Sequence, residues 1–221
     1  MKLLFNALIK FICGLVLCGL LIFLPAGTLH YFGGWLFMGA VFIPILIMGV
    51  VLFLKAPDLL KKRLNYKEKE QTQKGVVLGS ILLFLIIFIL AGLDFRLGWS
   101  AMPRGVSVAA AGLFLAGYAM YAEVLRENAY LSRTVEVQQG QKVIDTGLYG
   151  IVRHPMYLAT ILLFGAVPLM LGSWYMLIPF GFYPALLVLR IRNEEQVLVS
   201  QLQGYADYQI KVKYRLIPLV W

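Results

Sequence analysis

Long apolar runs separated by short polar connections dominate the chain. Six such runs can be marked, and the charged residues gather between them. The first four reach the roughly 17 to 25 residues that a membrane-spanning helix needs. The last two are shorter and contain prolines, so they form either a tight spanning hairpin or a kinked pair that does not fully cross. We therefore predict an all-α, polytopic helical membrane protein with about six transmembrane segments. The predicted segments are 11–31, 35–54, 76–93, 106–124, 156–171 and 174–189.

Composition supports this class and excludes others. Hydrophobic residues make up 61% of the 221 residues and charged residues 14%, whereas a soluble domain has about 25% charged residues. A soluble domain, a disordered chain, a coiled coil and a disulfide-rich module are therefore excluded. The only cysteines, Cys13 and Cys18, lie within one apolar run, so we expect neither a disulfide framework nor a metal site. No cleavage site follows this run, which we interpret as a retained helix and not a signal peptide.

The distribution of basic residues predicts the orientation. With six crossings, eighteen of the 20 Lys and Arg residues fall on one side, and only Arg96 and Arg104 fall on the other. Because cytoplasmic loops retain Lys and Arg, both termini are predicted to be cytoplasmic in a protein of the cell membrane. The net charge of +9 then follows from topology and attraction to anionic lipid, and indicates no nucleic-acid partner. The basic loop 55–74 is interpreted as a solvated connector.

We expect one integral membrane domain over residues 1–221. Residues 1–75, a helical pair with the basic loop, have few titratable groups within their apolar runs and are interpreted as scaffold. Residues 76–221 are interpreted as the functional core, because the polar clusters lie in the second half and Asp94 is the only acidic residue on the outer side. Within this core, alternation in 135–138 and 142–144 around Gln139-Gly140 is a weak signal for a β-hairpin.

The sequence Arg153-His154-Pro155 begins the fifth apolar segment. Proline suits the first turn of a helix and pushes the preceding residue towards an extended conformation. The amides of the helix start, its positive dipole end and the two basic side chains would converge into a corner that accepts anions. The alternative is that Arg153 is only a positive-inside anchor. For His30, the other histidine, we favour an ordinary interfacial role.

Two adjacent glutamates, Glu194 and Glu195, follow the sixth apolar segment. Residues i and i+1 differ by about 100° around a helix, so one can point inward while the other stays solvated. Arg190 lies four residues before Glu194 and could simply pair with it on the surface. A carboxylate just below the membrane is costly without a cation or hydrogen-bond donors. The pattern therefore favours a ligand that carries positive charge and hydroxyl groups.

Two tyrosines near the end of the chain, Tyr205 and Tyr208, allow two interpretations. They could belong to the aromatic belt that is common at a bilayer surface, or they could form the floor of a pocket for a cation or a purine ring. Asn128, at the end of the fourth predicted helix, is either part of a solvated terminus or a polar contact of the same pocket.

Together these motifs resemble the isoprenylcysteine carboxyl methyltransferase family and the phospholipid methyltransferases related to it. The resemblance covers about residues 126–221, and the N-terminal helices carry no family signature. The motifs that carry it are Thr146-Gly147-Leu148-Tyr149, Arg153-His154-Pro155-Met156-Tyr157, Arg192-Asn193-Glu194-Glu195, Gly204-Tyr205 and Tyr214-Arg215-Leu216-Ile217-Pro218.

The resemblance implies an integral membrane methyltransferase that uses S-adenosyl-L-methionine in a cytosolic pocket built by the C-terminal half. The cofactor-binding residues it implies are Gly147, Leu148, Tyr149, Arg153, His154, Tyr157, Glu194, Glu195, Tyr205 and Tyr208. The catalytic candidates are Arg192, Asn193 and Glu194; Arg192 is our first candidate for holding an acceptor carboxylate, because a guanidinium binds it in bidentate geometry. No metal is implied.

The acceptor and the runner-up functions stay open at this stage. The methyl acceptor could be the carboxylate of an isoprenylcysteine-like substrate, a lipid amine or a thiol, entering laterally from the membrane. An NADPH-dependent membrane reductase related to sterol reductases is one alternative, because those enzymes share an Arg-His-Pro helix start. A small transporter is less favoured, because its titratable residues would lie along the helix centres. The oligomeric state is not predicted.

Overall fold

The computed structural model describes residues 2–64, 71–131 and 135–221, and these ranges are helical with no strand. Lys67 and Lys69 of the basic loop, and Arg133, lie outside the described residues. The helices are α1 (Lys2–Ala26), α2 (Phe32–Lys55), α3 (Pro57–Arg63), α4 (Gln71–Leu97), α5 (Arg104–Glu127), the 3-10 turn η1 (Gly147–Gly150), α6 (Pro155–Met170), α7 (Leu177–Phe180), α8 (Tyr183–Gln201) and α9 (Tyr205–Lys211).

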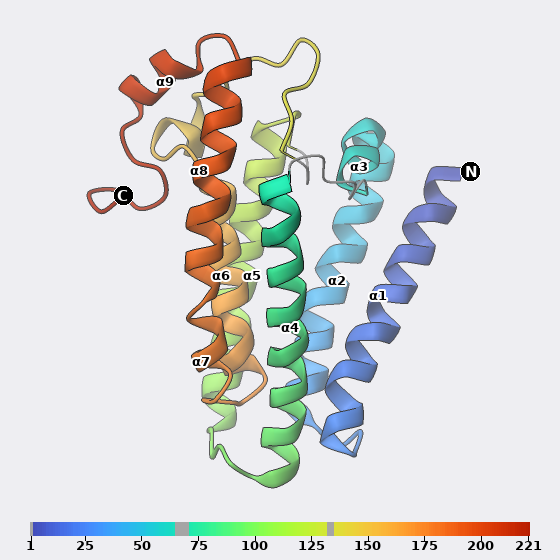
Figure 1. Ribbon diagram of the computed structural model, residues 1–221. Helices are drawn as coiled ribbons and strands as arrows, with labels where there is room; N and C mark the ends of the chain where they lie inside the picture. The colour runs from blue at the N-terminus through green and yellow to red at the C-terminus, as the bar shows by residue number, and fades with distance from the viewer. Residues whose placement is uncertain (1, 65–70, 132–134) are drawn as a thin grey trace.

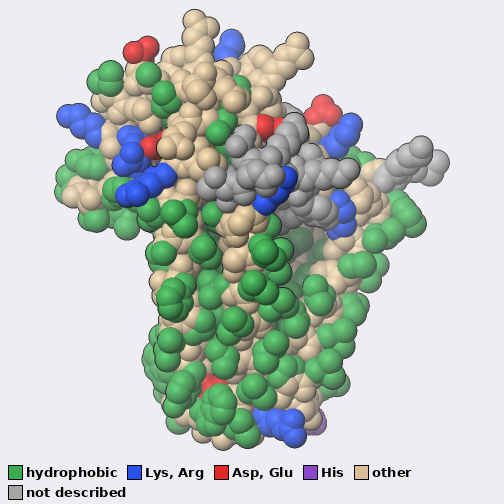
Figure 2. Space-filling view, in the orientation of Figure 1, with side chains coloured by type: hydrophobic (Ala, Val, Ile, Leu, Met, Phe, Trp, Pro, Cys, Tyr) green, Lys and Arg blue, Asp and Glu red, His purple; other side chains and the backbone are tan. Residues whose placement is uncertain are grey.

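The long helices run side by side as one bundle (Figure 1). The α4–α5 connection and α7 lie at one end, and α3, α9 and both chain ends lie towards the other. Figure 2 shows hydrophobic side chains covering the body of the bundle, while most Lys and Arg gather near the α9 end. Four helices, α1, α2, α4 and α5, are long and apolar enough to cross a membrane. This part of the all-α membrane fold is therefore confirmed.

Small residues let the helices approach closely, as is common in membrane bundles. A Cβ atom added to Gly92 in α4 would lie 2.7 Å from the carbonyl oxygen of Ile22 in α1. One added to Gly33 in α2 would lie 2.8 Å from the carbonyl oxygen of Met170 in α6. By contrast, a Cβ on Gly112 in α5 would meet no described atom within 4 Å. The helix α1 is thus packed tightly against α4, and α2 is packed tightly against α6.

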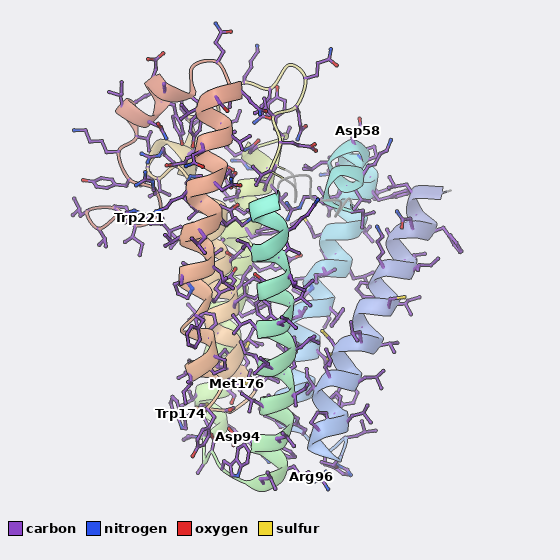
Figure 3. The ribbon with its side chains drawn as sticks, viewed as in Figure 1. Asp58, Asp94, Arg96, Trp174, Met176 and Trp221 are labelled. Atoms are coloured by element: carbon purple, nitrogen blue, oxygen red, sulfur yellow. The ribbon has the colours of Figure 1, made fainter. Side chains whose placement is uncertain are left out.

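A buried carboxylate ties two loops together at the end opposite α9. Asp94, only 1% exposed, accepts hydrogen bonds from the backbone N–H of Ser100 at 2.7 Å and from its hydroxyl at 2.6 Å. The hydroxyl of Ser173 also donates to Asp94, and the backbone N–H of Trp174 donates to Ser100 Oγ at 3.0 Å. Figure 3 shows Asp94, Trp174 and Met176 at this end, far from Trp221. The loop after α6 therefore reaches the same end of the bundle as the loop after α4.

The sixth predicted segment, 174–189, is not one helix. The short helix α7 ends at Phe180, and α8 begins at Tyr183 with Pro184 in its first turn. Proline fits a first turn but cannot donate a hydrogen bond within a helix, so it favours a new start at this point. The helix α8 then continues to Gln201 and carries the glutamates with it. The fifth segment is present as the 16-residue α6.

The predicted β-hairpin is wrong, although its turn exists. Gly140 has φ +71°, and the backbone N–H of Gln141 donates to the carbonyl oxygen of Gln138 at 3.0 Å. No strand forms within 135–144. Each arm of this segment is only three or four residues long, too short to stabilise an isolated pair of strands in water.

Candidate functional site

A buried ionic cluster joins the start of α6 to the middle of α8. Glu195 is 5% exposed, and Arg153 and His154 are similarly buried. Glu195 Oε1 accepts a hydrogen bond from Arg153 Nε at 2.7 Å, and His154 Nε2 lies 3.2 Å from the same oxygen. Arg215 Nε donates to Glu195 Oε2 at 2.8 Å. The histidine-arginine corner and the glutamate pair, some forty residues apart in sequence, therefore meet in space.

Charge within this cluster decides the ionisation of Glu195. Burial alone would raise the pKa of its carboxyl group, but hydrogen bonds from His154, Arg153 and Arg215 outweigh burial and lower the pKa to about 2. The carboxylate is therefore ionised at neutral pH. Buried carboxylates are tolerated when cations and hydrogen-bond donors surround them in this way.

The backbone after α9 completes the corner. Arg153 Nη1 donates to the carbonyl oxygens of Val212 and Lys213 at 2.6 and 2.9 Å. The backbone N–H of Arg153 donates to the carbonyl oxygen of Tyr214 at 2.9 Å, and that of His154 donates to the carbonyl oxygen of Arg215 at 2.8 Å. His154 is the N-cap of α6 with φ −126° and ψ 59°, followed by Pro155. The predicted non-helical conformation of His154 is confirmed, and it frees its N–H for this contact.

A second polar cluster lies beside the first, between α6 and α8. Arg190 Nε donates to the hydroxyl of Tyr157 at 2.9 Å, and that hydroxyl donates to Glu194 Oε2. The guanidinium carbon of Arg190 lies 6.0 Å from the centre of the Tyr157 ring. Arg190 and Glu194 therefore share Tyr157 as a common hydrogen-bond partner.

Both clusters border one pocket with a volume of about 100 Å³. It lies between the start of α6, the second half of α8, α9 and the connection that follows α5. The predicted cofactor-binding residues that line it are Tyr149, Arg153, His154, Tyr157, Glu194, Tyr205 and Tyr208.

Three tyrosines form one wall of this pocket. The hydroxyl of Tyr208 donates to the carbonyl oxygen of Tyr149 at 2.7 Å, and Asn128 Nδ2 donates to the hydroxyl of Tyr149 at 3.0 Å. Tyr205 is 4% exposed, and its buried hydroxyl has no hydrogen-bond partner among the described residues. Burial raises the pKa of the Tyr205 hydroxyl, and nearby Glu195 raises it further. The hydroxyl is therefore a neutral donor at neutral pH.

Other predicted residues lie outside the pocket lining. Arg192 is exposed and Asn193 is half-buried on α8, and neither borders the pocket. Gly147 and Leu148 belong to η1, which places the next residue, Tyr149, in the wall. Glu195 lies behind the wall, held by its cationic partners.

Sequence reasoning missed Arg190 as a pocket residue and left Asn128 undecided, although both line the pocket. The signal for Arg190 was its spacing of four residues from Glu194, which places both on one face of a helix. In the described ranges, no group of three or more His, Cys, Asp or Glu side chains could hold a metal ion.

Comparison with known proteins adds a family to this geometry. Residues 110–200 match the isoprenylcysteine carboxyl methyltransferase (ICMT) family. This range includes Arg153, His154, the helix α6 and both glutamates. The chain is also 34% identical over 91 residues to the Delta(14)-sterol reductase TM7SF2 of Mus musculus. That alignment covers 40% of this chain and 22% of the reductase, so the chain spans about a fifth of that relative.

Proposed function

Because residues 110–200 match the isoprenylcysteine carboxyl methyltransferase family, we propose that the chain is an integral membrane methyltransferase. It transfers a methyl group from S-adenosyl-L-methionine to a lipophilic acceptor. The observation that carries this proposal is the pocket at the start of α6, where the predicted residues of two distant motifs converge. When bound, S-adenosyl-L-methionine supplies a methyl group that is activated by a positive sulfonium.

The residues present fit such a cofactor chemically. The carboxylate of Glu194 and the rings of Tyr205 and Tyr208 border the pocket, and both carboxylates and aromatic faces attract a cation. The unpartnered hydroxyl of Tyr205 is a donor without an acceptor. A buried polar group without a partner destabilises the protein, so a polar ligand at this point would be favoured.

The ionic cluster behind the wall acts by positioning. Arg153 uses Nε and Nη1 for contacts with Glu195 and with backbone carbonyl oxygens. These bonds fix the start of α6 against α8 and so fix the spacing of the two sides of the pocket. Of the predicted cofactor contacts, we therefore assign Glu194 to direct contact and Glu195 to the support of the corner. Methyl transfer depends mainly on alignment and exclusion of water, which a rigid corner provides.

Size requires one adjustment of the pocket. Its volume of about 100 Å³ is below the roughly 300 to 1,000 Å³ typical of ligand sites. The segment 135–144 contributes several lining residues and has no regular secondary structure beyond its turn. We expect this segment to move outward to admit the cofactor and then to close over it. Hydrogen exchange of 135–144 should therefore slow in the presence of S-adenosylhomocysteine once the segment closes over it.

For an acceptor that carries a carboxylate, Arg190 is a better candidate than Arg192. Arg190 borders the pocket and lies at the hydrophobic part of α8, whereas Arg192 is exposed. Replacing Arg190 with Ala should raise KM for an S-farnesylcysteine carboxylate about tenfold or more, as expected when a charged hydrogen bond is lost. Arg192→Ala is the matched control and should change KM little. The reverse ranking would restore Arg192 as the acceptor residue.

We further propose six crossings, with the pocket and both chain ends on the cytosolic side. The contact between Asp94 and the loop after α6 supports α6 and α8 as a hairpin that reaches the opposite end. The concentration of Lys and Arg near the α9 end supports the orientation. Labelling of single cysteines at the exposed positions Tyr175 and Gln203 with a membrane-impermeant reagent should modify the first from outside the cell and the second only after permeabilisation.

The similarity to a sterol reductase favours one second candidate, an NADPH-dependent reductase. Thermal shift of the purified protein with S-adenosylhomocysteine and with NADPH separates the two, because a ligand that binds the folded state stabilises it. We expect stabilisation by S-adenosylhomocysteine alone. Stabilisation by NADPH alone would select the reductase and overturn the methyltransferase.

Tyr205→Phe gives a sharper test of the pocket. Removing its hydroxyl should lower affinity for S-adenosylhomocysteine about threefold to tenfold, the usual effect of one hydrogen bond. It should not lower the melting temperature of the ligand-free protein, because the hydroxyl has no partner there. Tyr175→Phe, at the opposite end of the bundle, is the control. Unchanged affinity in Tyr205→Phe would remove this residue from the site.

A further inference from the structure

The last described residues form a loop with an unusual exposed apolar tip. The chain closes on itself there, because the backbone N–H groups of Leu216 and Ile217 both donate to the carbonyl oxygen of Trp221, at 2.9 and 3.2 Å. Leu219 is 86% exposed and Val220 is 75% exposed. Two large apolar side chains at the tip of a small loop are unfavourable in water. We call residues 217–220 the apolar loop.

Both ends of the apolar loop are fixed to the protein. Leu216 is 6% exposed and belongs to the main hydrophobic core, and Trp221 packs against that core. The guanidinium carbon of Arg215 lies 5.3 Å from the centre of the Trp221 ring. The tip is therefore held outward on a rigid base.

The backbone at the tip is also strained. Leu219 has φ +66°, and it is the only described residue other than glycine with a positive φ. This conformation is uncommon for a leucine. A strained residue persists only when its surroundings determine it, and such residues often mark functional sites. Here the strain presents Leu219 to the outside of the molecule.

The position of the loop indicates what covers it. In Figure 1 the loop stands out beside α8 at about the height where α4 begins. Figure 2 shows hydrophobic side chains on this projection, near the upper limit of the apolar surface of the bundle, with Lys and Arg close by. Lys213, just before the loop, is exposed. Apolar side chains flanked by basic ones fit the boundary between acyl chains and anionic headgroups.

We propose that the apolar loop inserts into the cytosolic surface of the bilayer and thereby steadies the Arg153–His154 corner. Tyr214 and Arg215, just before the loop, supply the carbonyl oxygens that accept the backbone N–H groups of Arg153 and His154, and the Arg215 side chain binds Glu195. The tip that contacts lipid is thus only a few residues along the chain from Tyr214 and Arg215, which hold the Arg153–His154 corner of the pocket. The occupant of this surface is the lipid bilayer.

Depth in the membrane gives a direct test that does not depend on any cofactor. A nitrobenzoxadiazole probe is attached at Leu219→Cys in a chain whose Cys13 and Cys18 are changed to Ser, and the protein is reconstituted in vesicles of phosphatidylcholine and phosphatidylglycerol. Lipids with a spin label near the headgroup should quench this probe about twofold or more, as for a side chain inserted at the interface. The matched probe at Gln139→Cys, in the segment 135–144 whose turn rises past the end of α8 in Figure 1, should stay unquenched.

Equal, water-like emission at both positions would overturn the proposal. Shielding at Leu219→Cys without lipid quenching, together with a dimer in sedimentation, would also overturn it and assign the loop to a second copy of the chain.

Hydrogen exchange tests the link to the corner. In lipid nanodiscs, the double variant Leu219→Asp with Val220→Asp should accelerate exchange of the amides of Arg153 and His154 severalfold, because a charged tip is expelled from the bilayer. Gln139→Asp should leave both rates unchanged. Unchanged rates in the double variant would refute the link, whatever ligand the pocket binds.

Discussion

Replacing Glu195 with Gln should destabilise the protein strongly, although the side chain hardly changes size. Glu195 accepts hydrogen bonds from Arg153 Nε at 2.7 Å and from Arg215 Nε at 2.8 Å, and His154 Nε2 lies 3.2 Å away. A glutamine turns an NH₂ group towards one of these donors and removes the negative charge that two guanidinium groups require. Removing one partner of a buried ion pair costs about 3 to 5 kcal/mol.

The pKa of Glu195 gives an independent magnitude. Hydrogen bonding lowers it from 4.5 to about 2, and each unit corresponds to about 1.4 kcal/mol, so the ionised group stabilises the folded state by about 3 kcal/mol. For a chain of this size, 1 kcal/mol corresponds to about 2 to 4 °C in melting temperature. We therefore expect a fall of about 6 to 20 °C for Glu195→Gln.

The assay is thermal unfolding in detergent, followed by circular dichroism, with Glu194→Gln as the matched control. Glu194 is half-buried and borders the pocket, so its replacement should lower affinity for S-adenosylhomocysteine and shift the melting temperature much less. A melting temperature for Glu195→Gln within about 2 °C of wild type would refute the positioning role of this cluster. A large fall for Glu194→Gln with no fall for Glu195→Gln would mean that the two roles are reversed.

Three further outcomes follow from the same contacts. Gly92→Leu should lower the melting temperature by several degrees, because a Cβ there would lie 2.7 Å from backbone. Gly112→Leu is the control and should not lower it, since no described atom lies within 4 Å of a Cβ at that position. Equal effects of the two variants in thermal unfolding would contradict the packing. Because the folded pKa of Glu195 is lowered, its stabilisation is complete above about pH 4.5 and disappears as the pH falls to about 2, so unfolding curves of wild type and Glu195→Gln should converge over that range, and a constant gap would contradict the linkage. Asp94→Asn should destabilise the protein by about 1 to 3 kcal/mol, through unsatisfied hydroxyl and amide donors, and change the fluorescence of Trp174; an unchanged melting temperature would exclude a tie between the two loops.

The membrane class and the four long helices could be predicted from the sequence, because apolar length alone determines them. The break before Tyr183 could not be located, although its prolines were visible. Proline at a helix start and proline that kinks a continuous helix look alike in sequence, and packing of α7 and α8 decides between them. The hairpin prediction failed because alternation over three or four residues has no partner strand to satisfy it.

In the candidate site, too, some features could be predicted from the sequence and others could not. The two adjacent glutamates could be assigned to different faces of a helix from geometry alone. Which of them is buried depends on the rotation of α8 against α6, and on carbonyl and guanidinium groups from residues 212–215. These partners are remote in sequence. Every residue has a backbone carbonyl group, so the residue type does not indicate which carbonyl accepts a hydrogen bond. Likewise, the spacing of Arg190 and Glu194 left open a simple surface pair, whereas both side chains hydrogen-bond to the hydroxyl of Tyr157 from α6.

In the proposed mechanism, one pocket between α6 and α8 binds S-adenosyl-L-methionine. Ultraviolet cross-linking of the reconstituted protein with tritium-labelled S-adenosyl-L-methionine, followed by peptide mapping, tests it most directly. We expect label in the peptides that contain Tyr149–Tyr157 or Glu194–Tyr208, reduced by excess S-adenosylhomocysteine and unaffected by NADPH. Label confined to α1 and α2, or label that S-adenosylhomocysteine does not reduce, would contradict it.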